Sequence, residues 1–443
     1  MTFKLSAAAL IAAATLISQP AMAADLGGDC CADLEERIAE LEATTVRKGH
    51  RNVKLEISGW VNTSVLFWDD GEEQNIYVVD NIADRTRVRF RGSAKVNSDV
   101  EAGFLLEIGA RRGRNDRVSA DDDEGAGNGI DLRHSAWWLG SRTLGRVTVG
   151  QTSQSSDGIT QISTVGINHA ARSQVFDWNQ NFGIRRSNGV QSGATWRNIA
   201  SREAPGEGNR QNVVRYDTPT FSGFAASASW GEDDVWDVAL RYAGEIQGFK
   251  LAAGISYTQW TDVDTGSNTG NTCTRQGPAA GSNAECQSLG LSASVLHTET
   301  GLYGIFAYGY HEDDRRAGGI TNVAANLVDD RDEFYYFQGG LQRKWLPVGK
   351  TTVYGEYYRG NFGTSGGIAA GATTAPTINA GAGALISSEV DMWGFGINQS
   401  IEAAAMDFYV GYRNYEADLT TVNGAVGGVE GFQAVLTGAI IRF

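Results

Sequence analysis

Residues 85–91 read Arg-Thr-Arg-Val-Arg-Phe-Arg, a stretch in which every second side chain is an arginine. In an extended strand alternate side chains point to opposite faces, so Thr86, Val88 and Phe90 share one face and the arginines share the other. The basic face consists of Arg85, Arg87, Arg89 and Arg91. At a rise of about 3.3 Å per residue it is roughly 20 Å tall, close to the roughly 25 Å apolar band of an outer-membrane barrel. The stretch predicts a strand that separates water from an apolar surface.

The first 23 residues have the organisation of a secretory signal peptide. Lys4 precedes an apolar run over 5–17, and Ala21-Met22-Ala23 has the small-x-small form found before a cleavage site. A membrane anchor is the alternative, but the run is shorter than the roughly 20 residues that cross a bilayer as a helix. We therefore expect export and cleavage after Ala23. No later stretch is long and apolar enough for a transmembrane helix.

The composition favours sheets over helices. Glycine is abundant (56 residues), proline is scarce (6) and aromatic residues make up 10%, a mixture typical of long strands with tight bends. The formal net charge of −15 argues against nucleic acid as a partner, because nucleic acids are bound by basic surfaces. Among the four cysteines, Cys273 and Cys286 lie in one polar segment, and we expect them to form a disulfide in an exported protein. The adjacent Cys30 and Cys31 are assigned no role.

From residue 52 onward the hydrophobic pattern has a period of two. Sixteen stretches show it: 52–68, 86–97, 100–111, 133–142, 146–152, 211–219, 224–231, 235–246, 249–260, 286–298, 301–312, 333–345, 350–361, 389–401, 405–416 and 432–443. Short connections alternate with longer ones, which predicts an up-and-down meander with its long loops at one end. Before it, residues 24–51 contain one short helix. Its apolar stripe of Leu34, Ile38 and Leu41 either packs on its own chain or forms a short coiled coil in an oligomer.

Alternation within the stretches fits a barrel with a polar interior. In 100–111, for example, Phe104 and Leu106 share one face, and Glu101 and Glu107 share the other. A soluble barrel with its apolar face inside would alternate in the same way. The export signal, the one-sided loops and strands of ten or more residues favour the membrane. We therefore predict an all-β protein, a sixteen-stranded antiparallel transmembrane β-barrel over 52–443 in the cell outer membrane.

The final stretch has one unexpected face. It ends in the aromatic residue Phe443, and the face that does not carry Phe443 consists of Ala434, Leu436 and Ile440. These side chains are less polar than the wall of a water-filled lumen should be. Either a neighbouring element packs on them, or the pleat is assigned one residue out of register.

Three segments together resemble the trimeric general porins of alphaproteobacteria. They are Asp-Leu-Glu-Glu-Arg-Ile-Ala-Glu-Leu-Glu over 33–42, Leu-Glu-Ile-Ser-Gly-Trp-Val-Asn over 55–62, and the closing Ile-Ile-Arg-Phe over 440–443. The resemblance covers essentially the whole mature chain. It implies a water-filled channel of sixteen strands, in agreement with the strand count, and a homotrimer, which the spacing of the strands does not show.

The resemblance also implies that the third external loop folds into the barrel and narrows it. The matching segment, about 153–210, is the longest connection, and a structureless loop of that length in a compact protein is usually functional. We expect Asp177, Arg185 and Arg186 of this constriction loop to contribute to the pore. The acidic loop motif of enterobacterial porins is absent from this segment, so their field geometry does not carry over.

The predicted function is passive diffusion of small hydrophilic solutes and ions. An arginine on the lipid face near mid-membrane costs roughly 2–4 kcal/mol, so the arginines of 85–91 should face the lumen. The expected pore lining is Arg85, Arg87, Arg89, Arg91, Glu101, Glu107, Arg111 and Arg241. Such a lining would set up a transverse field that selects solutes by charge. Alternatively, the charges form an internal network that stiffens the wall without selecting anything.

No pattern of catalytic residues stands out. The adjacent His134 and Ser135 would point to opposite faces of a strand, so they cannot act as a base and nucleophile pair. We expect no enzymatic activity, no cofactor and no metal site, with outer-membrane lipid and lipopolysaccharide as further partners. The alternative function is a structural or surface-binding barrel, an adhesin or receptor that acts through its external loops and gives no conductance in planar bilayers.

Overall fold

A computed structural model gives the fold of the protein. It describes residues 53–110, 113–125, 129–200, 204–231, 234–261, 285–313, 327, 329–363 and 385–443. The predicted signal peptide, the helix within 24–51, Arg111 and Cys273 lie outside the described residues. No helix within these ranges is long and apolar enough to cross a membrane.

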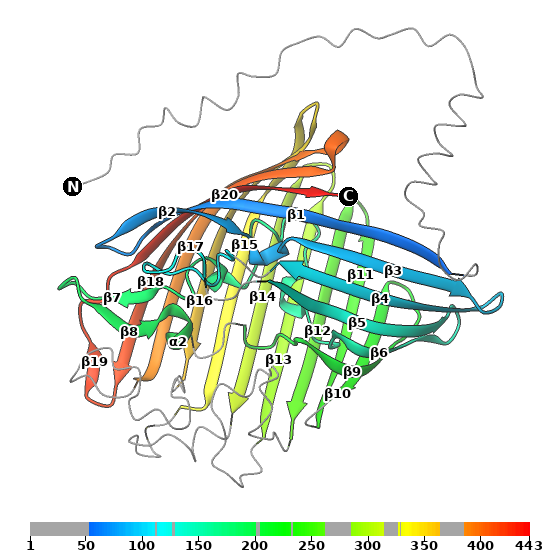
Figure 1. Cartoon of the computed structure of the whole chain (residues 1–443), viewed down its shortest axis with the longest axis horizontal. Helices are drawn as coiled ribbons and strands as arrows, with labels where there is room; N and C mark the ends of the chain where they lie inside the picture. Colours follow the sequence, from blue (N-terminus) through cyan, green and yellow to red (C-terminus); the bar gives the residue numbers. More distant parts are fainter. Residues whose placement is uncertain are drawn as a thin grey trace. The chain divides into compact units, whose positions relative to one another are not determined.

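Sixteen antiparallel strands form a closed barrel, which confirms the predicted fold class and strand number (Figure 1). They are β1 (Lys54–Asp69), β3 (Arg87–Lys95), β4 (Val100–Ala110), β5 (Ile130–Ser141), β6 (Gly145–Ser153), β9 (Arg210–Asp217), β10 (Phe224–Gly231), β11 (Val235–Ile246), β12 (Phe249–Trp260), β13 (Cys286–His297), β14 (Leu302–Asp313), β15 (Arg331–Leu346), β16 (Gly349–Phe362), β17 (Leu385–Ile401), β18 (Met406–Thr421) and β20 (Phe432–Arg442). The first and last strands pair from Trp60 opposite Arg442 to Asp69 opposite Gln433, and this pairing closes the sheet.

The two ends of the barrel differ in the length of their connections. Tight turns such as 142–144 and 247–248 define the short-turn end, and the longer connections define the long-loop end. Along each strand the side chains alternate between the two sides of the wall. In β5, for example, Trp137 is 55% exposed on the outer face, whereas the next residue, Trp138, is 5% exposed on the lumen face. An apolar outer face and a polar or packed inner face are what a barrel in lipid requires.

Small elements interrupt or extend this pattern. They are β2 (Gln74–Asp80), β7 (Gly183–Arg185), β8 (Gln191–Thr195), β19 (Gly424–Val426), α2 (Trp196–Ile199) and the single 3-10 turns η1 (Ile82–Asp84), η2 (Ile159–Gln161), η3 (Val175–Trp178) and η5 (Glu402–Ala404). β3 pairs with the first part of β1, and β2 pairs with the second part, so β2 and β3 together occupy one strand position beside β1. Between them the chain leaves the sheet at η1, where the Asn81 side chain accepts a hydrogen bond from the Ala83 amide at 3.0 Å.

The connection between β6 and β9, residues 154–209, is here called the inner loop because it follows the lumen side of successive strands. The Ser156 amide donates to Asp237 of β11 at 2.7 Å. Farther along, the Thr164 hydroxyl lies 2.7 Å from the Ser294 hydroxyl of β13. The Gln342 side chain of β15 then donates to the Val165 carbonyl at 2.9 Å. In Figure 1 the later part of the loop, with β7, β8 and α2, lies beside β17, which α2 contacts.

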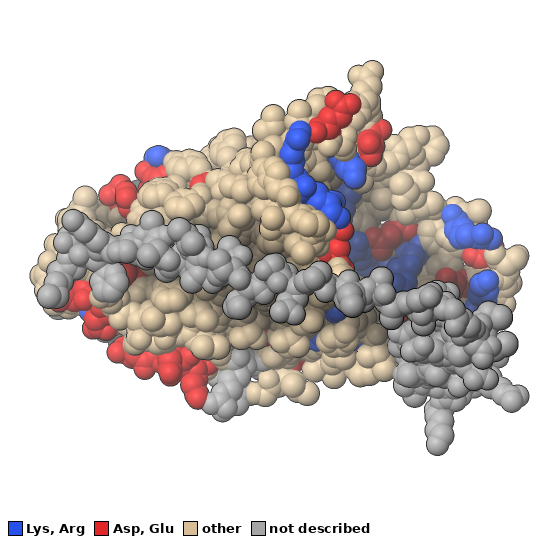
Figure 2. Space-filling view, turned by 90° about the horizontal axis from the view of Figure 1, so that it is seen from above, with Lys and Arg blue, Asp and Glu red and all other residues tan. Residues whose placement is uncertain are grey.

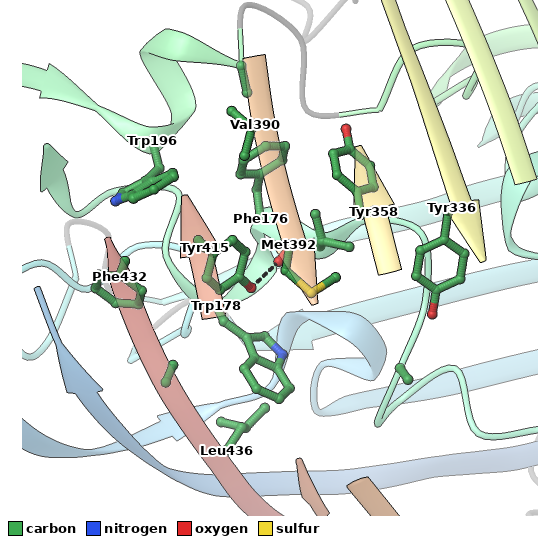
Figure 3. Close-up of a cluster of buried hydrophobic side chains, with 14 of the residues drawn as sticks. Phe176, Trp178, Trp196, Tyr336, Tyr358, Val390, Met392, Tyr415, Phe432 and Leu436 are labelled. Atoms are coloured by element: carbon green, nitrogen blue, oxygen red, sulfur yellow. Dashed lines mark hydrogen bonds between the residues drawn. The ribbon is translucent and has the colours of Figure 1, made fainter. Parts of the chain in front are cut away.

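An apolar core holds the inner loop against the wall (Figure 3). The loop contributes Phe176, Trp178, Trp196 and Ile199, and the wall contributes Tyr336, Tyr358, Met392, Tyr415, Phe432 and Leu436. The Tyr415 hydroxyl donates to the Val175 carbonyl at 2.6 Å, so the polar atoms at this contact are also paired. Leu436 and Ala434 of β20 are buried in the same core. At Ala434 and Leu436, the unexpectedly apolar face of the last strand is therefore covered by a neighbouring element.

Candidate functional site

The lumen wall away from this core carries charge. Strands β3 to β6 and β9 border a cavity of about 710 Å³ whose lining includes Arg89, Arg91, Glu101, Arg146 and Asp217. Figure 2 looks into a hollow in which basic and acidic side chains gather between uncharged surfaces. The inner loop and the charged wall thus lie on different parts of the same interior.

A single carboxylate lies at the centre of the charged wall. Glu107 of β4 has a fully buried side chain and accepts hydrogen bonds from Arg89 at 2.5 and 2.8 Å. Arg87 donates to it at 3.3 Å and Arg133 at 2.7 Å. Three guanidinium groups share one carboxylate, which leaves a formal excess of two positive charges. We call these four residues the Glu107 cluster.

Arg133 was not predicted at this site, and a β-bulge explains its position. Glu107 lies opposite His134, but the next residue, Ile108, lies opposite Leu132, so Arg133 is an extra residue in β5. A bulge of this kind bends the strand and re-aims a side chain. If alternation continued without a bulge from Trp138, Arg133 would lie on the lipid face. An arginine there is energetically unfavourable, and this conflict could have indicated the bulge from the sequence.

The sequence predicted that Arg85 shares a strand face with Arg87, Arg89 and Arg91, but β3 begins only at Arg87, after η1. The Arg85 side chain is buried and forms an ion pair with Asp131 of β5 at 2.5 Å. Gly109 provides the space: a Cβ atom there would lie 2.8 Å from the Arg133 side chain and 2.9 Å from the Arg85 side chain. The absence of a side chain at Gly109 lets two arginines from different segments lie against the wall.

The inner loop reaches η1, the turn that precedes β3, through Arg172. This residue pairs with Asp177 of the same loop at 2.6 Å and donates to the Ala83 carbonyl of η1 at 2.8 Å. Nearby, the Asn81 side chain donates to the His169 carbonyl at 2.8 Å. The loop and η1 are thereby joined by two hydrogen bonds. Burial raises the pKa of Asp177, even though the Arg172 guanidinium acts in the opposite direction.

Two other buried titratable groups fix the path of the loop. Glu207 accepts hydrogen bonds from the Gly158 amide at 2.6 Å and from the Thr160 amide at 2.5 Å, which ties the end of the loop to its beginning. Burial raises the pKa of Glu207. The His169 ring lies 2.8 Å from the Asn398 side chain of β17, and burial lowers the pKa of His169.

The remaining predicted residues are placed elsewhere. Arg241 donates to the Ser155 and Asp157 carbonyls at 2.7 and 3.0 Å and so braces the start of the inner loop. Arg185 pairs with Asp70 at 2.7 Å, and the backbone of Arg186 forms a bridge with Val429. The structure therefore brings Arg87, Arg89 and Glu107 together, whereas Asp177, Arg185, Arg186 and Arg241 make other contacts. Cys286 is buried at the start of β13, and its pairing with Cys273 stays a prediction.

Comparisons with known proteins agree with this architecture. The family model described as Gram-negative porin matches residues 7–418. The anion-selective porin from Comamonas acidovorans has a similar fold, with a TM-score of 0.55 and 15% identity over 88% of this chain and 100% of that chain. The Salmonella typhi OmpF complex with daunomycin gives a TM-score of 0.50 and 11% identity over 88% and 98%. No curated protein matches the sequence. At these identities the solved structures show the fold alone, but the family match spans most of the chain, which belongs to the Gram-negative porins.

Proposed function

We propose that this porin is a general diffusion channel for small hydrophilic solutes and ions, with its charge selectivity set by the Glu107 cluster and the inner loop. Family membership indicates a channel rather than an enzyme. The single observation that carries the selectivity proposal is the formal excess of two positive charges around Glu107 on the lumen wall. Charged groups at a narrow passage favour solutes of opposite charge.

Passage in this proposal is passive and needs no chemical step. A solute crosses between the charged wall and the inner loop, down its concentration gradient. The ion pairs hold the guanidinium groups in place, so the electrostatic field of the wall is present before a solute arrives. Binding of the solute therefore does not have to order any of these side chains. An internal network and a selective wall are thus compatible, because the network carries a net charge.

The surrounding assembly is part of the same proposal. We infer export with cleavage after Ala23, contact of the barrel with outer-membrane lipid and lipopolysaccharide, assembly as a homotrimer and a disulfide between Cys273 and Cys286. Conductance in planar bilayers under a salt gradient tests the channel and its ion preference together. Closure of the current in three equal steps would support the trimer, whereas a protein that inserts and gives no conductance would refute the channel.

Replacing Arg87 and Arg89 with Ser should widen the passage and shift selectivity towards cations. Both guanidinium groups leave the lumen, and Glu107 keeps Arg133 at 2.7 Å, so the local excess of positive charge disappears. The expected readouts are a higher single-channel conductance and a reversal potential displaced in the cation-selective direction. Replacing Arg343, which is exposed, and Arg359, which is half-exposed, with Ser is the control with the same change in charge. An unchanged conductance and reversal potential in the lumen variant would contradict the assignment.

A further inference from the structure

We propose that Arg91, Trp138 and Arg146 form a binding site for small organic dicarboxylates at the short-turn end of the lumen. The proposal rests on the channel function and adds a site that is separate from the Glu107 cluster. The three residues come from three strands, β3, β5 and β6, and all line the 710 Å³ cavity. Turn residues Arg142, Thr218 and Thr220 line the same cavity, which places it at that end of the barrel.

The indole ring of Trp138 holds both arginines. The guanidinium carbon of Arg146 lies 4.4 Å from the ring centroid, and that of Arg91 lies 6.0 Å from it. A guanidinium over the face of a tryptophan is attracted by the ring quadrupole without losing its hydrogen-bond donors. The ring thus orients two cations and leaves their N–H groups available.

A glycine on the neighbouring strand makes room for the indole ring. Gly103 of β4 lies opposite Trp138, and a Cβ atom at Gly103 would lie 2.3 Å from the indole ring. Gly140 of β5 lies opposite Arg146, and a Cβ atom there would only be in ordinary van der Waals contact, 3.6 Å from the Arg146 and Trp138 side chains. The ring therefore lies against the wall instead of projecting into the passage, and Trp138 is only 5% exposed.

Neither arginine is neutralised by a carboxylate among the described residues. Asp217 is directly opposite Arg146 in the β6–β9 pairing, but it forms its ion pair with Arg215 at 2.6 Å. Arg91 lies between Leu105 of β4 and Glu56 of β1, and it forms no ion pair with Glu56 within 4.0 Å. Both Arg91 and Arg146 are exposed to the lumen. In this they differ from the arginines of the Glu107 cluster, whose donors are already engaged by Glu107.

Two guanidinium groups held by one indole ring determine which class of ligand can bind. Each guanidinium binds a carboxylate through two parallel N–H···O bonds, so two of them match a solute with two carboxylates. The guanidinium carbons cannot be farther apart than about 10 Å, the sum of their distances to the shared ring centroid. That span and the cavity volume suit a short dicarboxylate.

Succinate tests the site in single-channel recordings of the intact protein. In KCl of constant ionic strength, added succinate should reduce the open-channel current in a saturable manner, and propionate, with one carboxylate, should act about tenfold more weakly. Arg91→Gln and Arg146→Gln should each raise the half-saturating succinate concentration about tenfold. Arg142→Gln is the matched control, since it removes one charge from the same cavity wall but Arg142 donates to the Ser98 carbonyl and does not contact Trp138.

The possible results distinguish a failure of the binding-site proposal from a failure of the proposed channel function. Equal effects of all three substitutions, or equal action of succinate and propionate, would show a diffuse positive field and overturn the site. If the protein conducts in KCl and succinate does not change the current, the binding site is refuted and the channel function is unaffected. A wild-type protein that gives no current in KCl would instead refute the channel itself, and with it the basis of the proposal.

Discussion

Replacing Glu107 with Gln is expected to destabilise the barrel by about 3–5 kcal/mol and to make the channel more anion-selective. The carboxylate is fully buried and is the shared acceptor for Arg87, Arg89 and Arg133. A neutral amide removes the charge that holds three guanidinium groups together, and its NH₂ group faces N–H donors. Urea unfolding of the refolded protein, followed by tryptophan fluorescence, measures the stability, and the reversal potential in a salt gradient measures the selectivity.

Glu101→Gln provides the matched control for this substitution. Glu101 lies on the same strand and the same lumen face, lines the open cavity and is only partly buried. Its replacement changes the net charge equally, so it should move the reversal potential in the same direction. Its effect on the free energy of unfolding should stay below about 1 kcal/mol, because the Glu101 carboxylate is reached by solvent. Equal destabilisation by the two substitutions would mean that the Glu107 cluster is not a special support of the wall.

Replacing Arg413 with Met should release the inner loop and cost about 3–5 kcal/mol. Arg413 and Glu356 form an ion pair at 2.8 Å in which each side chain is 1% exposed. Arg413 also donates to the Val175 carbonyl at 3.0 Å, and its guanidinium lies 4.3 Å from the centre of the Trp178 ring. Without Arg413, Glu356 is a buried charge without its ion-pair partner, and the loop loses a hydrogen bond and a stacking contact. We expect a lower urea midpoint together with a larger and noisier open-channel current.

A double variant distinguishes the cost of leaving Glu356 unpaired from the cost of losing the contacts between Arg413 and the loop. The double variant Arg413→Met with Glu356→Leu removes both charges, and since apolar replacements of a buried pair are often neutral, it should recover most of the lost stability. Arg359→Met removes a half-exposed arginine that pairs with Glu389 at 2.5 Å and should cost no more than about 1 kcal/mol. A double variant as unstable as Arg413→Met alone would show that the hydrogen bond to the loop, and not the unpaired Glu356, accounts for the loss.

The barrel was predictable because its strands obey a simple period. A lipid-facing side chain and a lumen-facing side chain alternate, so Trp137 and Trp138 have opposite environments although they are adjacent. The number of strands follows from counting such stretches. The position of Arg85 could not be predicted from this period. The turn η1 separates β2 from β3, and the hydrogen bond that holds η1 leaves no trace in the alternation of polar and apolar residues.

The cluster was predictable only in part. Arg87, Arg89 and Glu107 lie on regular strands, and the cross-strand pairing of Arg89 with Glu107 brings them together. Arg133 needs a bulge, and the role of Arg172 depends on the path of a loop that is held by tertiary contacts. The sequence alone contains charged residues throughout that loop, so Asp177 was a reasonable expectation for the lumen. In the structure its partner is Arg172, five residues away in the same loop.

The inner loop and the charged wall lie in one segment of the gene, and most of the surface that holds the loop lies outside that segment. The Glu107 cluster, the dicarboxylate site and the loop all lie within residues 85–217. In the core that holds the loop, Leu66 and Trp68 precede that segment, and Tyr358, Met392, Tyr415 and Phe432 follow it. Recombination that exchanged 85–217 between two porins would transfer the charge pattern in one event. It would also place a foreign loop on aromatic residues selected for another one. Inheritance of selectivity by such chimaeras is therefore limited by whether the strands before and after this segment accept the incoming loop.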